Sequence, residues 1–187
     1  MKRFADTSPR FKARMAGVAF FVTMLTAAFT ELFVRMRGSL NFASDIAAGV
    51  VEVLGMVAVT LLLYIIFRPV NKGLSLLAAC VNLVALACEC LQLQLRGVAV
   101  GLVFHGFYWL LVGYLVFKSS FLPRILSVPM TIAGLGWMVF LSPRLADHLS
   151  PYHMVSAVVA EALVFLSLLV SGVNVQRWKE QASSSVN

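Results

Sequence analysis

The side chains in this sequence that could do chemistry are carboxylates and imidazoles standing inside long apolar runs. Glu89, His105 and Glu161 each lie within such a run. Carboxylate and imidazole groups can ligate a divalent metal, relay protons, or act as general acid and base. An ionisable side chain in hydrocarbon costs roughly 2.5–3.5 kcal/mol, so each of these residues needs a partner, a cavity or a role.

Helical spacing predicts that these groups converge. Asn82 and Glu89 share one face of a helix, and so do His105 and Tyr108. We therefore hypothesise an outward-open polar pocket ringed by Glu89, His105 and Glu161, with Asn82 and Tyr108 beside them. Four more residues are predicted nearer its mouth: Glu31, Glu52, His148 and His153.

Two other interpretations of the same residues stay open. Glu89 and Glu161 could be hydrogen-bonded packing residues between helices, with Glu52 at headgroup depth and Glu31 paired with Arg35 one turn away. Alternatively, the carboxylates could act as acid and base on a lipid or other substrate at the outer leaflet.

No motif assigns a catalytic residue or a cofactor. The sequence contains no H-x-x-x-H or H-E-x-x-H pair, and no G-x-S-x-G, phosphate-loop or dinucleotide motif. No cofactor is therefore predicted. If a divalent metal binds, Glu89, His105 and Glu161 are its candidate ligands.

The composition indicates which kind of scaffold must hold these groups. Hydrophobic residues make up 60% of the 187-residue chain and charged residues only 12%, and the mean hydropathy is +0.91. Soluble domains carry about 25% charged residues. So few charges could not cover a soluble fold of this size, whereas a surface that faces lipid should be apolar.

Six runs are long enough to cross a membrane, which takes about 20 mostly apolar residues. They are Met15–Val34, Ala48–Phe67, Leu74–Leu95, Val98–Phe117, Ile125–Ser142 and Tyr152–Val173. The runs lack the period-two alternation of barrel strands, so the sequence predicts an all-α bundle. The Arg96–Gly97 link is the shortest connection and predicts an antiparallel hairpin. Residues 1–14 form a basic N-terminal segment, residues 15–173 the membrane domain, and residues 174–187 a partly disordered tail.

The basic residues predict the orientation of the bundle. Eleven lysines and arginines fall at the end that holds both termini and four at the other, and the basic side of a membrane protein is cytoplasmic. Both termini are therefore expected in the cytoplasm. This bias accounts for the formal net charge of +7 without a nucleic-acid partner. Lys118 and Arg124 lie on the basic side and could hold anionic lipid headgroups, or could serve only as a positive stop signal.

Several stretches resemble a bacterial family of multipass membrane proteins known only as domain of unknown function 4386. The most specific is Gly113-Tyr-Leu-Val-Phe-Lys-Ser-Ser-Phe-Leu-Pro-Arg124. Others are Ala133-Gly-Leu-Gly-Trp137, Gly172-Val-Asn-Val-Gln-Arg-Trp178, Ala13-Arg-Met-Ala-Gly17 and Phe67-Arg-Pro-Val-Asn-Lys72. The resemblance implies a multipass protein of the bacterial inner membrane, and it carries no activity with it.

These observations predict an integral membrane protein that binds or passes a small solute, ion or proton through an outward-facing polar pocket, and that is not an enzyme. One alternative is a membrane-embedded hydrolase, metal-dependent or acid/base, acting at the outer leaflet. The other is a structural subunit that pairs with itself or with another membrane protein through small-residue stripes.

Overall fold

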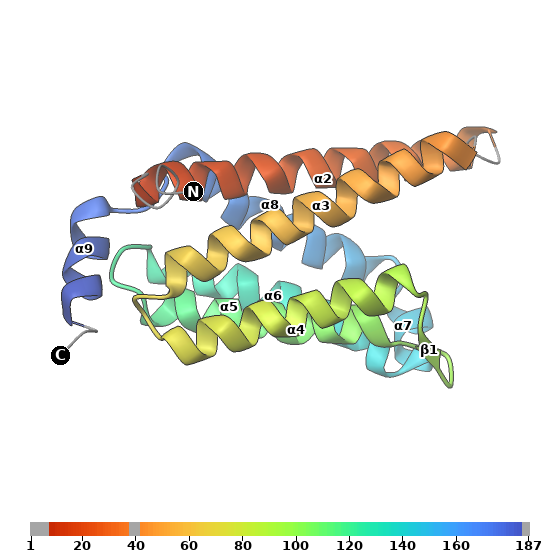
Figure 1. The fold of residues 1–187 in the computed structure, drawn as a ribbon. Coiled ribbons are helices and arrows are strands. Elements are labelled where there is room, and N and C mark those ends of the chain that lie inside the picture. The colour runs from red at the N-terminus through yellow and green to blue at the C-terminus, as the bar shows by residue number, and fades with distance from the viewer. Residues whose placement is uncertain (1–7, 38–41, 185–187) are drawn as a thin grey trace.

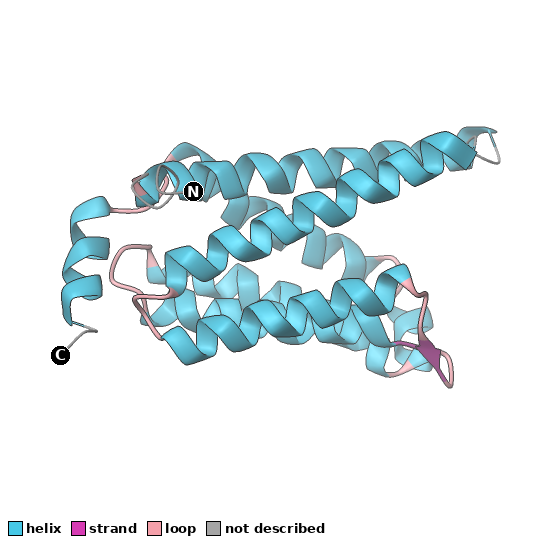
Figure 2. Ribbon diagram, in the orientation of Figure 1, coloured by secondary structure: helices cyan, strands magenta, loops and turns pink. Residues whose placement is uncertain are grey.

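The computed structural model describes residues 8–37 and 42–184, with the side chains of residues 31–45 left out of the description. This part of the chain forms eight α-helices and one pair of two-residue strands (Figures 1 and 2). Six of the helical segments are long and apolar enough to cross a membrane. The predicted all-α bundle with six spans is confirmed.

The α-helices run between the following residues. They are α2 (Pro9–Arg37), α3 (Phe42–Phe67), α4 (Lys72–Cys90), α5 (Val100–Lys118), α6 (Ser127–Met138), α7 (Pro143–Leu149), α8 (Tyr152–Val170) and α9 (Val175–Ser184). Two 3-10 turns, η1 (Arg124–Leu126) and η2 (Val139–Leu141), extend α6 to complete the fifth span. Helices α7 and α9 are too short to span a membrane.

The spans pack most closely as α5 on α6, α2 on α3, α4 on α5, and α6 on α8. Helix α8 also packs on α2, which closes the bundle. The start of α2 and helix α9 lie at one end, called here the α9 end, and the strands and α7 lie at the opposite β-hairpin end (Figure 1). Between α3 and α4 the packing is sparse, and the two helices diverge toward the β-hairpin end (Figure 1).

Helix α5 lies deepest in the bundle. Its Tyr108 and Trp109 are buried, and the Trp109 ring meets Phe165 of α8 edge to face at 5.7 Å. Phe165 in turn stacks on Phe20 of α2 with ring centroids 3.9 Å apart. Aromatic side chains in a central helix supply large contact areas to several neighbours at once. Helix α5 therefore lies at the centre of the core, and the other helices pack around it.

Two glycines let α5 and α6 approach closely. A Cβ placed on Gly106 would lie 2.8 Å from the backbone oxygen of Gly134, and one on Gly134 would lie 2.9 Å from the backbone oxygen of Gly106. Small residues at such crossings are the usual means of close helix packing in membranes, where no hydrophobic effect draws helices together. This contact places His105, beside Gly106, directly at the α5–α6 interface.

The prediction that the third span runs to Leu95 is wrong at its end. Helix α4 stops at Cys90, where Gln92 adopts φ +48° and the amide of Leu93 donates to the Cys88 carbonyl at 2.9 Å, as in a Schellman cap. Strands β1 (Gln94–Leu95) and β2 (Val98–Ala99) then pair antiparallel. Arg96 and Gly97, at φ +53° and +81°, form the two-residue turn between them, with the positive φ values that a type I′ turn requires. The expected antiparallel hairpin is present, but its tip is a β-ribbon.

Other boundaries also differ from those expected. Helix α2 begins at Pro9, inside the segment predicted to precede the first span. The segment predicted as a loop between the last two spans contains α7, with Pro143 at its first turn. The tail predicted to be partly disordered forms α9 as far as Ser184.

Candidate functional site

A chain of hydrogen bonds between side chains crosses the middle of the bundle. The indole Nε1 of Trp109 donates to His105 Nε2 at 2.9 Å, and His105 Nδ1 lies 3.1 Å from Asn82 Oδ1. Asn82 Nδ2 donates to Thr60 Oγ1 at 2.7 Å, and this hydroxyl donates to the backbone oxygen of Met56 at 2.7 Å. The chain therefore ties α5 to α4 and α4 to α3.

The order of donors and acceptors assigns the protonation of His105. An indole N–H can only donate, so His105 Nε2 accepts. The amide nitrogen of Asn82 is used on Thr60, which leaves its oxygen to accept a proton from His105 Nδ1. His105 is thus neutral with its proton on Nδ1. Both of its nitrogens are occupied, and the residue is only 8% exposed.

Beside this chain, Glu161 of α8 forms a separate hydrogen bond with α6. Its carboxylate accepts a hydrogen bond from Trp137 Nε1 of α6, and Oε1 lies 4.0 Å from His105 Nε2. Glu161 is only 4% exposed. A buried carboxyl group without such a donor would carry the cost of desolvation uncompensated. Five helices, α3, α4, α5, α6 and α8, therefore contribute polar side chains to one enclosed region.

Tyr108 packs beside this chain without joining it. The residue is buried, and its ring lies 4.7 Å from that of Trp109. Its hydroxyl lies against Thr60 but outside hydrogen-bonding geometry. A cavity of about 10 Å³ borders both residues, which is about the volume that one water molecule requires. The contribution of Tyr108 to the site is its bulk.

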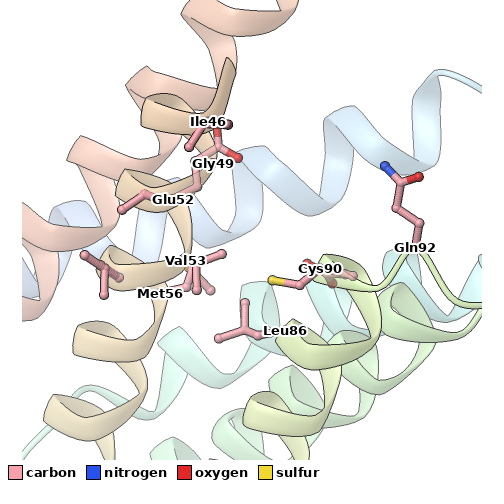
Figure 3. Close-up of a pocket in the computed structure, with 11 residues that line it drawn as sticks. Ile46, Gly49, Glu52, Val53, Met56, Leu86, Cys90 and Gln92 are labelled. Carbon is pink, nitrogen blue, oxygen red and sulfur yellow. The ribbon is translucent and has the colours of Figure 1, made fainter. Parts of the chain in front are cut away.

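A groove opens between α3 and α4 at the β-hairpin end (Figure 3). It encloses a space of about 740 Å³, within the range of roughly 300–1,000 Å³ that is common for small-molecule sites. Most of its wall is apolar, with Val53 and Met56 on α3 facing Leu86 on α4 (Figure 3). Both helices are candidate membrane spans, and Val50 and Leu54 of α3, which line the groove, are exposed on the surface.

Two carboxylates stand in this apolar groove, Glu52 on α3 and Glu89 on α4. Neither forms a hydrogen bond or an ion pair with any residue that the structure describes. Glu52 is half-buried and Glu89 is exposed to the groove. At roughly 2.5–3.5 kcal/mol for each charged group in a span, this arrangement is costly unless something else occupies the groove.

The structure therefore divides the predicted pocket into two parts. Asn82 and His105 meet in the enclosed chain with Glu161 beside it, whereas Glu89 lies in the open groove. The backbone of α4 and Gly101 of α5 separate the two, because the Glu89 side chain packs on Gly101, one turn from His105. No group of three potential metal ligands, Glu89, His105 and Glu161 included, lies close together among residues 8–37 and 42–184.

The residues predicted at the pocket mouth lie in different places. Glu52 lines the groove. His153 is buried between α6 and α8, edge-on to Phe140 at 5.1 Å, and its ring nitrogens have no hydrogen-bond partner in the described part of the chain. His148 is exposed on α7. The side chain of Glu31 is outside the described residues.

Three residues of these hydrogen-bonded groups were not among the predicted site residues, and they are Thr60, Trp109 and Trp137. Thr60 and the two indoles lie in apolar runs and carry no charge, so hydropathy does not single them out. Trp109 follows His105 by one helical turn, which is a spacing that the sequence does show. Trp137 and Glu161 lie on two different helices, so the sequence around either residue does not indicate that they pair.

At the α9 end, the turn between α5 and η1 is held by α9. Gln181 Oε1 accepts from the backbone amide of Ser120 at 3.0 Å and from its hydroxyl at 2.9 Å. Trp178 Nε1 donates to the backbone oxygen of Ile66 at 2.9 Å. Lys118 and Arg124, the candidate lipid-binding residues, are exposed and lie near the rings of their own segment rather than in ion pairs.

Six apolar helices packed around an enclosed polar chain define a multipass integral membrane protein. Residues 87–172 match the model of the family described as domain of unknown function 4386, which confirms the resemblance over this part of the chain. The matched part holds α5, α6 and α8 with His105, Trp137 and Glu161, but not Thr60 or Asn82.

One relative is an uncharacterised protein of Archaeoglobus fulgidus, 30% identical over 91 residues. The alignment covers 44% of this chain and 56% of that protein, so the chain spans little more than half of the relative. No solved structure matches this chain.

Proposed function

We propose that this protein binds a small ligand in the α3–α4 groove, on the side of the membrane opposite its two termini. The observation that carries the proposal is the pair of carboxylates, Glu52 and Glu89, facing an apolar space of about 740 Å³ without a partner among the described residues. Concave, mostly apolar sites with a few convergent polar groups are the usual form of ligand pockets.

The polar chain joins α3 to α4 at the end of the groove that lies nearer the middle of the bundle. Asn82 ties α4 to Thr60 on α3, and the hydroxyl of Ser75 donates to the backbone oxygen of Tyr64 at 3.0 Å nearer the α9 end. Met56, one turn beyond Thr60, already lines the groove. The two helices are thus joined up to the middle of the membrane and apart beyond it. The two helices are therefore fixed to each other at the inner end of the groove and are not hydrogen-bonded to each other along its sides within the described residues.

Binding fits the geometry better than catalysis does. A general base needs an available lone pair within reach of its substrate. His105 uses Nε2 to accept from Trp109 and Nδ1 to donate to Asn82, and Glu161 is enclosed beside it. The groove itself offers two carboxylates and no imidazole or nucleophile beyond Cys90.

The distribution of basic residues supports an orientation with the α9 end in the cytoplasm of a plasma membrane. Nine lysines and arginines with described side chains lie at that end: Arg10, Lys12, Arg14, Arg68, Lys72, Lys118, Arg124, Arg177 and Lys179. At the β-hairpin end only Arg96 and Arg144 are described. In this orientation the groove opens to the exterior, and the basic end faces anionic lipid headgroups.

The native cysteines allow a direct test. Cys90 lines the groove, whereas Cys80 is exposed on the same helix outside it. A chain that keeps Cys90 alone should react with a membrane-impermeant maleimide in right-side-out vesicles, and a chain that keeps Cys80 alone should not. Reaction of Cys90 only in inverted vesicles would reverse the orientation. An unreactive Cys90 on both sides would show that the groove is closed to water and would refute the proposal.

A further inference from the structure

We infer that the ligand of the α3–α4 groove is an amphiphilic cation, with an apolar body and an ammonium-type head, which enters sideways from the lipid. The inference rests on the proposed function and adds the chemical class of the ligand. It follows from the apolar lining of the groove, from the position of its two carboxylates, and from the poorer fit of other classes of ligand.

The position of the charges indicates a ligand with two different ends. Glu89 is the penultimate residue of α4, and Glu52 lies six residues after Ile46 at the start of the second membrane span. Both carboxylates are therefore near the β-hairpin end, at the depth where headgroups meet acyl chains. Met56 and Leu86 line the groove farther from that end. A ligand with its head between the carboxylates would place its body against these apolar side chains.

The carboxylates indicate the sign of the head. They come from two facing helices, and within the described part of the chain no lysine, arginine or histidine contacts either one. A positive head between them would be attracted by both carboxylates in surroundings of low dielectric, where the Coulomb attraction is strongest. Cationic residues in the same groove would have indicated an anionic ligand, and the groove residues include none.

Other occupants fit less well. A neutral acyl chain would cover the apolar wall and leave both carboxylates without a partner. A metal ion would find two carboxylates and no third ligand, because no cluster of three ligands occurs among the described residues. A small hydrophilic cation would match the charge but would leave the space beside Met56 and Leu86 unfilled.

The way in is open to the membrane. Val50 and Leu54 on α3 are 50% and 64% exposed, and Leu91 after α4 is 69% exposed, so the rim of the groove presents apolar side chains to lipid. The walls diverge, and in the described part of the chain no side-chain hydrogen bond joins α3 to α4 beyond Thr60. A molecule already dissolved in the outer leaflet could therefore reach the carboxylates without crossing water.

The test uses the reactivity of Cys90 in protein purified in dodecyl maltoside. Chains that keep Cys90 alone, or Cys80 alone as the control outside the groove, are labelled with N-ethylmaleimide. The probes are dodecyltrimethylammonium, tetramethylammonium (the head without a tail) and dodecanol (the tail without a charge). Dodecyltrimethylammonium is expected to slow the labelling of Cys90 but not that of Cys80, and the other two probes should have little effect.

Variants then identify the groups responsible. Glu52→Gln combined with Glu89→Gln should raise the concentration of dodecyltrimethylammonium needed for protection at least about tenfold, which corresponds to about 1.4 kcal/mol. Glu180→Gln is the matched control, because it removes the same charge from exposed α9, where the Glu180 side chain accepts one hydrogen bond within the described residues, from Gln176 at 3.3 Å. Unchanged labelling of Cys90 without probe would confirm that each variant is folded.

The outcomes separate this inference from the proposed function. Equal protection by dodecanol, or protection that survives both glutamine substitutions, would overturn the cation and leave a ligand-binding groove. Equal protection by tetramethylammonium would overturn the apolar body. A reactive Cys90 that no probe protects would overturn the amphiphilic cation altogether. Only a Cys90 that is unreactive without any probe would overturn the groove as a binding site.

Discussion

The crossing of α5 and α6 allows the packing of the bundle to be tested with one methyl group. A Cβ on Gly106 would lie 2.8 Å from the backbone oxygen of Gly134 and 2.8 Å from Cγ of Met138. Ordinary contacts begin near 3.4 Å, so Gly106→Ala must move the helices apart by about 0.6 Å. The backbone oxygen cannot turn away as a flexible side chain could, and a gap of this size forfeits a quarter to a half of each neighbouring contact energy.

The expected cost is about 1–3 kcal/mol, as for other overpacked cores. Alanine also favours a helix over glycine by about 1 kcal/mol, which would hide part of the cost. Gly49→Ala on α3 removes this ambiguity, because a Cβ there meets nothing within 4 Å. Both variants gain the same helix propensity and only one gains the clash. Gly106→Ala should therefore be less stable than Gly49→Ala by about 1–3 kcal/mol.

The measurement is reversible unfolding in mixed micelles of dodecyl maltoside and dodecyl sulfate, followed by tryptophan fluorescence. Trp109 and Trp137 both lie near the crossing and should report its loss. Equal free energies of unfolding for the two alanine variants would show that α5 and α6 do not cross at Gly106. The placement of His105 at that interface would then be refuted as well.

Three further outcomes follow from the polar groups, and the first two use the same unfolding assay. Asn82→Leu breaks the enclosed chain at its centre and should cost about 1–3 kcal/mol, while Thr26→Val, which loses only a bond within its own helix, should cost far less; similar values would contradict the chain. Trp137→Phe removes the donor to Glu161 and should cost about 1.5–3 kcal/mol, so an unchanged stability would show that the carboxyl group has another partner. Trp178→Phe should speed amide hydrogen exchange throughout α9 without altering α5, and unchanged exchange would mean that other contacts hold this helix.

The division between an enclosed chain and an open groove changes what the polar residues can do. Asn82 and His105 bond each other, Trp109 bonds His105, and Trp137 bonds Glu161, and these bonds hold the helices in register. Interhelical hydrogen bonds of this kind contribute modestly, about 0.6 kcal/mol each on average in membrane proteins, but they fix which faces meet. Glu52 and Glu89 have no such partner among the described residues, and the proposed ligand recognition rests on them.

The β-ribbon after α4 shows a local signal that hydropathy overlooks. From Leu91 to Arg96 the sequence alternates leucine with a polar residue, Leu-Gln-Leu-Gln-Leu-Arg, and Gly97 follows. Averaged hydropathy counts the leucines and extends the span, whereas the period of two and the Arg-Gly pair indicate a short strand and a tight turn. The alternating pattern predicts the hairpin, whereas the length of the apolar run wrongly extends the third span.

The sequence by itself determined that this chain crosses a membrane six times. Long apolar runs with few charges have no other stable state, because every backbone polar group in lipid must be bonded within its own helix. It also marked His105, Asn82 and Glu161 as polar groups that need partners. Only the tertiary structure decided that Thr60 and Trp137 are among their partners, because these two residues lie on other helices that pack against them. It likewise decided that Glu89 lines a groove with Glu52, because α3 packs mainly on α2 and α4 mainly on α5, which leaves the two helices apart.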